Sequence, residues 1–98
     1  MQSSQSLITV TDLGPAKLIG RLAKHWAHKL EVEHDDTGAR IQFDQAVCTL
    51  RVQGDAIAAA IESADSATLD TLEMVVAEHL QRMSRGETLS IQWQRAAA

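Results

Sequence analysis

The sequence predicts an α+β fold, a two-layer sandwich in which two helices cover one face of an antiparallel sheet. Three observations predict it. Apolar residues recur every second position in several short segments, they recur with a helical period in two longer ones, and turn residues separate the segments. Strands that alternate in this way have one buried and one wet face, as in antiparallel sheets. The predicted order of elements is β-α-β-β-β-β-α-β.

A strand and a helix are expected first. Leu7–Thr11 alternates and is rich in β-branched residues, which is typical of a strand. Asp12-Leu13-Gly14-Pro15 then breaks the pattern, and Pro15 suits the first turn of a helix. The segment Ala16–Lys29 has a helical period. Its apolar face consists of Leu18, Ile19, Leu22 and Trp26.

Four short strands are expected next, over residues 30–33, 39–44, 47–52 and 57–62. Turn residues separate two pairs of them, at Asp35-Asp36-Thr37-Gly38 and at Gln53-Gly54-Asp55. The alanine-rich stretch Ala56–Ala60 has helical propensity. Its short length and the neighbouring turn residues favour a strand.

The chain is expected to end with a helix over Ser66–Ser84 and a strand over Thr88–Gln94. Asp65 or Ser66 caps this helix, and Gly86 suits the position after its end. The buried stripe of the helix is Leu69, Leu72, Val76, Leu80 and Met83. The last strand is expected to bury Leu89, Ile91 and Trp93.

The length of 98 residues predicts one domain, over residues 6–95, with flexible ends at 1–5 and 96–98. The order of elements resembles one half of the TATA-binding-protein fold with an added C-terminal strand, a likeness of topology that says nothing of function. Cys48 is the single cysteine, so no disulfide forms within the chain. No apolar segment suits a signal peptide or a membrane span, and a cytoplasmic location is expected.

Composition argues against nucleic acid as a partner. The net charge is −4, which disfavours broad contact with phosphates. Trp26, Phe43 and Trp93 are all expected on buried faces, so none is left to stack on a base. The chain also has no phosphate-binding glycine loop, dinucleotide fingerprint or nucleophile–base motif. A binding domain is therefore favoured over an enzyme.

Three histidines are candidates for a metal site. His25 and His28 lie three residues apart on the first predicted helix, and His79 lies beside the apolar stripe of the second. If the helices pack side by side, His25 and His79 meet, and converging imidazoles hold Zn²⁺ or Fe²⁺. The alternative is that each imidazole hydrogen-bonds a carbonyl or a carboxylate and has no further role, because H-x-x-H alone is a weak pattern.

The outer face of the first predicted helix is basic. At the helical period its cationic side chains fall within about 60° of one another. They are Lys17, Arg21, Lys24 and His28. This face suits an anionic partner, namely a phosphate, a carboxylate-rich siderophore or an acidic protein surface. The alternative is an ordinary solvated face.

Several segments also resemble the sequences of a known family. They are Lys24–Lys29, Val32-Glu33, Gly38–Phe43, Leu72–Arg82 and Ile91–Trp93. Together they resemble the bacterial domain-of-unknown-function family twenty-two eighteen, from about Ser6 to Gln94. That family has no settled activity, and some members are linked to siderophore-interacting ferric reductases. The resemblance implies an accessory domain of iron metabolism whose partner is such a reductase or a ferric siderophore.

Three hypotheses for function follow. The first is a non-catalytic accessory or binding domain of bacterial iron (siderophore) metabolism. The second is a small metal-binding protein or metal-dependent enzyme that uses His25, His28 and His79. The third is an interaction module that self-associates into a homo-oligomer through an exposed strand edge. No membrane partner is expected under any of the three.

Overall fold

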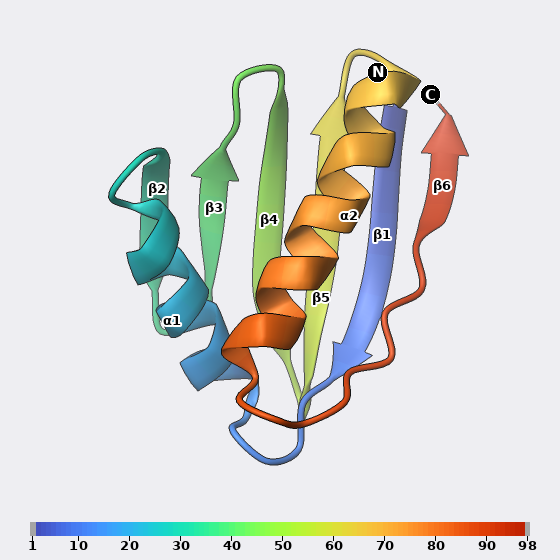
Figure 1. The fold of residues 1–98 in the computed structure, drawn as a ribbon. Coiled ribbons are helices and arrows are strands. Elements are labelled where there is room, and N and C mark those ends of the chain that lie inside the picture. The colour runs from blue at the N-terminus through green and yellow to red at the C-terminus, as the bar shows by residue number, and fades with distance from the viewer. Residues whose placement is uncertain (1, 98) are drawn as a thin grey trace.

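In the computed structural model, which describes residues 2–97, six strands form one antiparallel sheet and two helices cover one of its faces (Figure 1). The elements are β1 (Gln2–Thr9), α1 (Pro15–Trp26), β2 (Glu31–Asp35), β3 (Gly38–Gln42), β4 (Ala46–Gln53), β5 (Ala56–Ser63), α2 (Ser66–Met83) and β6 (Gln94–Ala97). The predicted two-layer α+β fold and its order of elements are confirmed.

The strands are arranged in the order β2-β3-β4-β5-β1-β6. The four strands from β2 to β5 form a meander, in which each strand pairs with the next along the chain. The first strand then adds to the free edge of β5, and β6 adds to β1. Helix α2 therefore connects β5 to a strand on the far side of β1, and both ends of the chain lie in neighbouring strands (Figure 1).

The core lies between the helices and the sheet. The predicted helix stripes are confirmed, with Met83 half-buried at the end of α2. In β5 the alternate residues Ile57, Ala59 and Ile61 are buried, which confirms the predicted strand. The helical propensity of its alanines is overcome because β5 pairs along its whole length with both β4 and β1.

Helix α1 ends three residues earlier than predicted. It stops at Trp26, and the backbone N–H groups of Lys29 and Leu30 both donate to the Trp26 carbonyl, at 3.0 and 2.7 Å. These bonds close a turn that leads the chain back into β2. His28 therefore lies in this turn and not on the helix.

Helix α2 begins where it was predicted to begin. The carboxylate of Asp65 accepts the backbone N–H of Thr68 at 2.7 Å and its hydroxyl at 3.1 Å. These bonds hold the pKa of Asp65 below its ordinary value. Within residues 2–97, neither helix is both long and apolar enough to cross a membrane.

The two end strands differ from the prediction. The first strand was expected at Leu7–Thr11 and the last at Thr88–Gln94, but the strands are Gln2–Thr9 and Gln94–Ala97. Residues 2–5 pair with residues 94–97, although residues 1–5 and 96–98 were expected to be flexible. Residues 1 and 98 lie outside the described part.

The segment before β6 has the predicted burial without the predicted pairing. Leu89 is buried, and Ile91 and Trp93 are half-buried against the core. The alternation of these three residues therefore correctly predicted that one side of the segment is buried. An extended segment can bury one side without pairing with a strand of the sheet.

Candidate functional site

A depression with a basic lining lies between the C-terminal half of α1 and the end of α2. Its volume is about 380 Å³. Its lining residues are Arg21, Lys24, His25, His28, Arg82, Met83 and Arg85. Six of these seven residues are basic side chains and none is acidic. We call this depression the basic pocket.

The packing of α1 fixes one wall of the basic pocket. Leu22, Ala23 and Trp26 are buried, whereas Lys24 and His25 between them are exposed. Arg21, Lys24 and His25 are spaced by three and four positions, which places them as neighbours on the helix surface.

The turn after α2 fixes the other wall. The oxygen of the buried Ser84 hydroxyl lies within hydrogen-bond distance of the carbonyl oxygens of Gln81 and Glu87, at 2.7 and 2.8 Å. The Gln81 amide donates to the Glu87 carbonyl at 2.6 Å, and its oxygen accepts the N–H of Leu89 at 2.8 Å. These bonds hold Arg85 in a left-handed conformation, with φ of 60°, which residues other than glycine rarely adopt.

The cations of the basic pocket have no ion-pair partner within the described residues. Across residues 2–97 the ion pairs join Arg40 to Glu33, and Arg95 to Glu73 and Asp70. None of these involves a residue of the pocket. The four Arg and Lys charges of the pocket therefore attract anions from solution, although the whole chain carries a net charge of −4.

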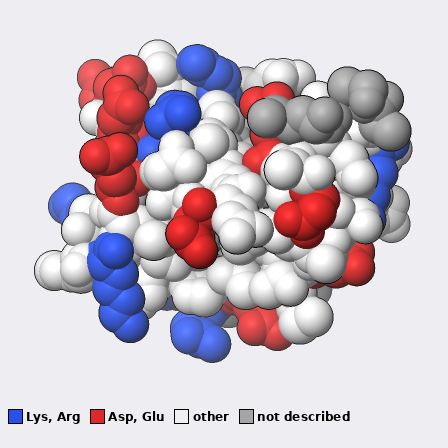
Figure 2. Space-filling view, turned by 90° about the horizontal axis from the view of Figure 1, so that it is seen from above, with Lys and Arg blue, Asp and Glu red and all other residues white. Residues whose placement is uncertain are grey.

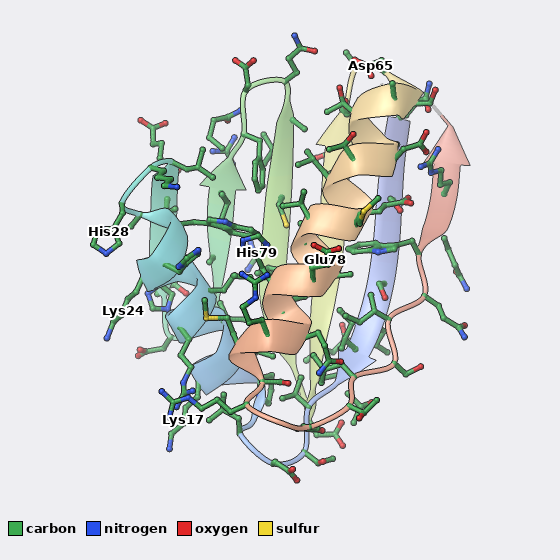
Figure 3. All side chains as sticks on the ribbon, in the orientation of Figure 1. Lys17, Lys24, His28, Asp65, Glu78 and His79 are labelled. Atoms are coloured by element: carbon green, nitrogen blue, oxygen red, sulfur yellow. The ribbon has the colours of Figure 1, made fainter. Side chains whose placement is uncertain are left out.

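An array of rings runs from the basic pocket through the buried Trp26 to the half-buried Phe43. The ring centroids of His25 and His79 are 5.5 Å apart, those of His79 and Trp26 are 5.0 Å apart, and those of Trp26 and Phe43 are 5.2 Å apart. We call these four residues the ring stack. His79 lies between the two helices, as Figure 3 shows, and its Nδ1 donates to the Val75 carbonyl at 2.7 Å. His25 is the exposed end of the stack.

The structure brings together two of the three histidines considered as metal ligands. His25 and His79 meet between the helices, whereas His28 lies in the turn after α1 and points away from them (Figure 3). Among residues 2–97, no three His, Cys, Asp or Glu side chains converge on one point. Catalytic zinc sites use three protein ligands, and the described residues supply two.

Cys48 does not extend this pair. Its side chain is fully buried on the helix-facing side of the sheet. Burial raises the pKa of its thiol to about 12. The free thiol is therefore protonated at neutral pH.

The predicted basic face divides between two depressions. Arg21, Lys24 and His28 line the basic pocket. Lys17 does not, and lines a neighbouring depression of about 580 Å³ together with Asp35 and Asp36, which Arg21 and Lys24 also border. Charges of both signs meet there. Figure 2 shows one end of the molecule, where acidic side chains gather at one corner with basic side chains beside them.

Two members of the basic pocket, Arg82 and Arg85, were not among the candidate site residues that the sequence indicated. Arg82 follows His79 by three positions, so it lies on the same side of α2. That spacing could have placed Arg82 beside α1. Arg85 could not have been placed, since its position depends on the left-handed turn.

The open face of the sheet has depressions of a different character. One of about 630 Å³ has a floor of Ala58 and Ala60 and a rim that includes Gln5 and Gln94. Another, of about 390 Å³, combines arginines with the carboxylates of the β2–β3 hairpin. The first has a single charged residue, Arg51, and the second has charges of both signs, whereas the basic pocket gathers several charges of one sign.

Comparisons with known proteins agree with this fold. The family described as "Uncharacterized protein conserved in bacteria (DUF2218)" matches residues 9–94. The NMR structure of PA4090 from Pseudomonas aeruginosa is similar, with 36% sequence identity, a TM-score of 0.75, and coverage of 95% of this chain and 94% of that one. No protein of curated function matches the chain. The matched residues include both walls of the basic pocket.

Proposed function

Because the chain belongs to the DUF2218 family of uncharacterized bacterial proteins, its function must be inferred from its own residues, and we propose that it is a non-catalytic domain that binds a small anion in the basic pocket. One observation carries the proposal. Four Arg and Lys side chains, from the two helices and from the turn after α2, line a single depression, and none of them has an ion-pair partner within residues 2–97. Arginine is well suited to this role because its planar guanidinium donates two parallel hydrogen bonds to a carboxylate or a phosphate.

The lining of the basic pocket supports binding over catalysis. It contains no serine, threonine, cysteine or carboxylate, so it offers no side-chain nucleophile of these types. Its histidines are exposed, and His79, which contacts His25, already donates to a backbone carbonyl. Such a site recognises charge without breaking a bond.

The iron setting implied by the family resemblance fits within this proposal. A ferric siderophore with free carboxylates has the charge that the basic pocket attracts, and so has an acidic surface on a partner reductase. We include a ferric carboxylate chelate among the ligands to be tested for this reason.

Titration calorimetry at low ionic strength tests the proposal. The ligands are phosphate, citrate and ferric citrate. We expect saturable binding that weakens with added salt, because the contact is between charges near the surface. Removal of one charged donor in Arg82→Gln or Arg21→Gln should weaken binding by about tenfold, since a hydrogen bond to a charged group contributes about 1.5 kcal/mol or more.

Lys17→Gln is the matched control. It removes a charge from the same face of α1 but outside the basic pocket. An equal loss of affinity in Lys17→Gln and Arg82→Gln would show general attraction by a basic surface and would overturn the proposal. So would the absence of saturable binding for all three ligands.

A metal site at the His25–His79 pair is the second candidate function, and the 5.5 Å separation of the two rings favours it. A zinc titration followed by the imidazole NMR signals tests it. Binding should be lost in His25→Ala and in His79→Ala and kept in His28→Ala. Binding that persists in His79→Ala would contradict it.

A further inference from the structure

The ring stack and the basic pocket share one residue, His25, and this shared position suggests the chemical class of the ligand. We propose that the anion bound in the basic pocket carries a planar aromatic ring, as an aryl carboxylate does. The inference rests on the proposed function and specifies its ligand.

The stack is continuous up to the pocket wall. Phe43, Trp26, His79 and His25 follow one another with centroid separations between 5.0 and 5.5 Å. Aromatic rings attract one another in offset or tilted arrangements at separations of about 4.5–7 Å. His25, at one end, is exposed in the basic pocket; Trp26, inside the stack, is buried; and Phe43, at the other end, is half-buried against the core. A further ring bound in the pocket would extend this series.

The basic pocket also has an apolar element among its cations. Met83 lines it and is half-buried against the core. A methionine thioether makes favourable contacts with aromatic rings. The aliphatic stems of Arg21, Lys24 and Arg82 add further apolar surface below their charged groups. An inorganic anion would use the charges and leave this surface unused.

The size of the basic pocket limits the ligand. Small-molecule pockets have volumes of roughly 300–1,000 Å³. The volume of about 380 Å³ is near the lower end of that range, so it suits a molecule of one or two rings. The carboxylate of such a molecule would pair with the guanidinium groups of the two helices while its ring lies against His25.

Three monocarboxylates separate the contributions of charge, apolar surface and aromatic ring. Acetate carries the charge alone, cyclohexanecarboxylate adds an apolar ring that is not planar, and benzoate adds an aromatic ring. Their binding is measured by NMR titration at low ionic strength. We expect benzoate to bind about threefold to tenfold more tightly than either of the others, from the usual strength of an aromatic pair. The imidazole protons of His25 should move upfield with benzoate only, because only an aromatic ring produces a ring current.

Two variants assign the preference to His25. His25→Leu replaces the ring by an apolar side chain and leaves all four Arg and Lys charges in place, so the ratio of benzoate affinity to acetate affinity, measured in the same variant, should fall to about one. His28→Leu removes the other pocket histidine, which is outside the ring stack, and should keep the preference. The amide spectrum of each variant checks that it is folded. If His25→Leu does not fold, His25→Gln is used in its place.

The outcomes separate this inference from the proposed function. Equal affinity for acetate and benzoate overturns the inference and leaves the proposed function standing. Equal affinity for cyclohexanecarboxylate and benzoate also overturns it, because apolar surface then suffices. If no carboxylate, citrate or phosphate binds, both fail.

Discussion

At the scale of single residues, Ser6 and Ser4 differ in how their buried hydroxyls are satisfied. Both side chains point into the core from β1. The Ser4 hydroxyl donates to Oε2 of Glu73 at 2.6 Å, whereas the Ser6 hydroxyl is buried and has no partner within the described residues. A buried polar group without a hydrogen bond destabilises the folded state by the cost of removing it from water.

Ser6→Ala is therefore expected to raise the free energy of unfolding by about 1 kcal/mol, because it removes an unsatisfied hydroxyl and little volume. Ser4→Ala is the matched comparison. It breaks the bond to Glu73 and should lower the free energy of unfolding by about the same amount. Urea denaturation of both variants measures the two effects. A loss of stability in Ser6→Ala would mean that the hydroxyl has a partner.

Residue positions within regular helices could be predicted, and those at irregular turns could not. The meeting of His25 and His79 follows from the helical period and from the packing of two amphipathic helices. The position of His28 depends on the two bonds to the Trp26 carbonyl that end α1, and the position of Arg85 depends on its left-handed backbone. Neither feature leaves a periodic pattern in the sequence.

At the scale of elements, the start of β3 tolerates no side chain. Gly38 pairs with Arg51 on β4. A Cβ atom on Gly38 would lie 2.2 Å from the Leu50 carbonyl oxygen and 3.1 Å from the Arg51 Cα, and both of these atoms belong to the backbone. The two strands would have to separate to make room for it.

Gly38→Ala should therefore lower the free energy of unfolding by about 1–3 kcal/mol, the usual cost of overpacking, or by more if the β3–β4 pairing is lost. Gly20→Ala provides the contrast. A Cβ on Gly20, inside α1, meets only the His34 ring at an ordinary 3.7 Å, and alanine is the better helix former. The free energy of unfolding of Gly20→Ala should therefore rise by up to about 1 kcal/mol. Thermal unfolding followed by circular dichroism compares the two, and equal effects would contradict the prediction.

The sequence predicted the type of each element better than its pairing. Turn residues and alternation located the meander from β2 to β5, since each of its strands pairs with the next one along the chain. The neighbours of β1 and β6 depend on where the chain joins the sheet again after α2. Alternation in a sequence indicates which face of a segment is buried and not which strand lies beside it. The alternation of Leu89, Ile91 and Trp93 therefore could not predict the strand pairing.

At the scale of the whole molecule, a few carboxylates hold distant parts of the chain together. Glu73 on α2 accepts hydrogen bonds from Ser4 of β1 and from Arg95 of β6. Glu87 accepts the backbone N–H groups of Thr11 and Asp12, at 2.9 and 3.0 Å, and so ties the segment after α2 to the segment before α1. These bonds favour the charged carboxylates and hold the pKa of each below its ordinary value of 4.5.

The direction of these shifts predicts a loss of stability in acid. A carboxyl group whose pKa is lower in the folded state stabilises that state fully above its unfolded pKa, and the effect disappears as the pH falls through the folded pKa. The free energy of unfolding should be nearly constant between pH 7 and about pH 5 and should fall steadily below about pH 4.5. Glu73→Gln should be less stable than the parent chain at pH 7 and should lose less stability between pH 5 and pH 3. Urea denaturation at each pH measures this, and a parent chain that gains stability toward pH 3 would contradict it.

Because β1 pairs with β6, the protein is suited to circular permutation, in which the present termini are joined and new termini are made elsewhere. Gln2 lies opposite Ala97 in neighbouring antiparallel strands, so a turn of a few residues could join them as an ordinary hairpin (Figure 1). The chain could then be opened at the exposed Gln53-Gly54-Asp55 turn, where β4 and β5 would become the terminal strands. Such a circular permutant should keep the sheet and the basic pocket while moving both ends to the opposite end of the sheet. Fluorophores or fusion partners could then be attached there, away from Arg95 and the carboxylates that hold β6.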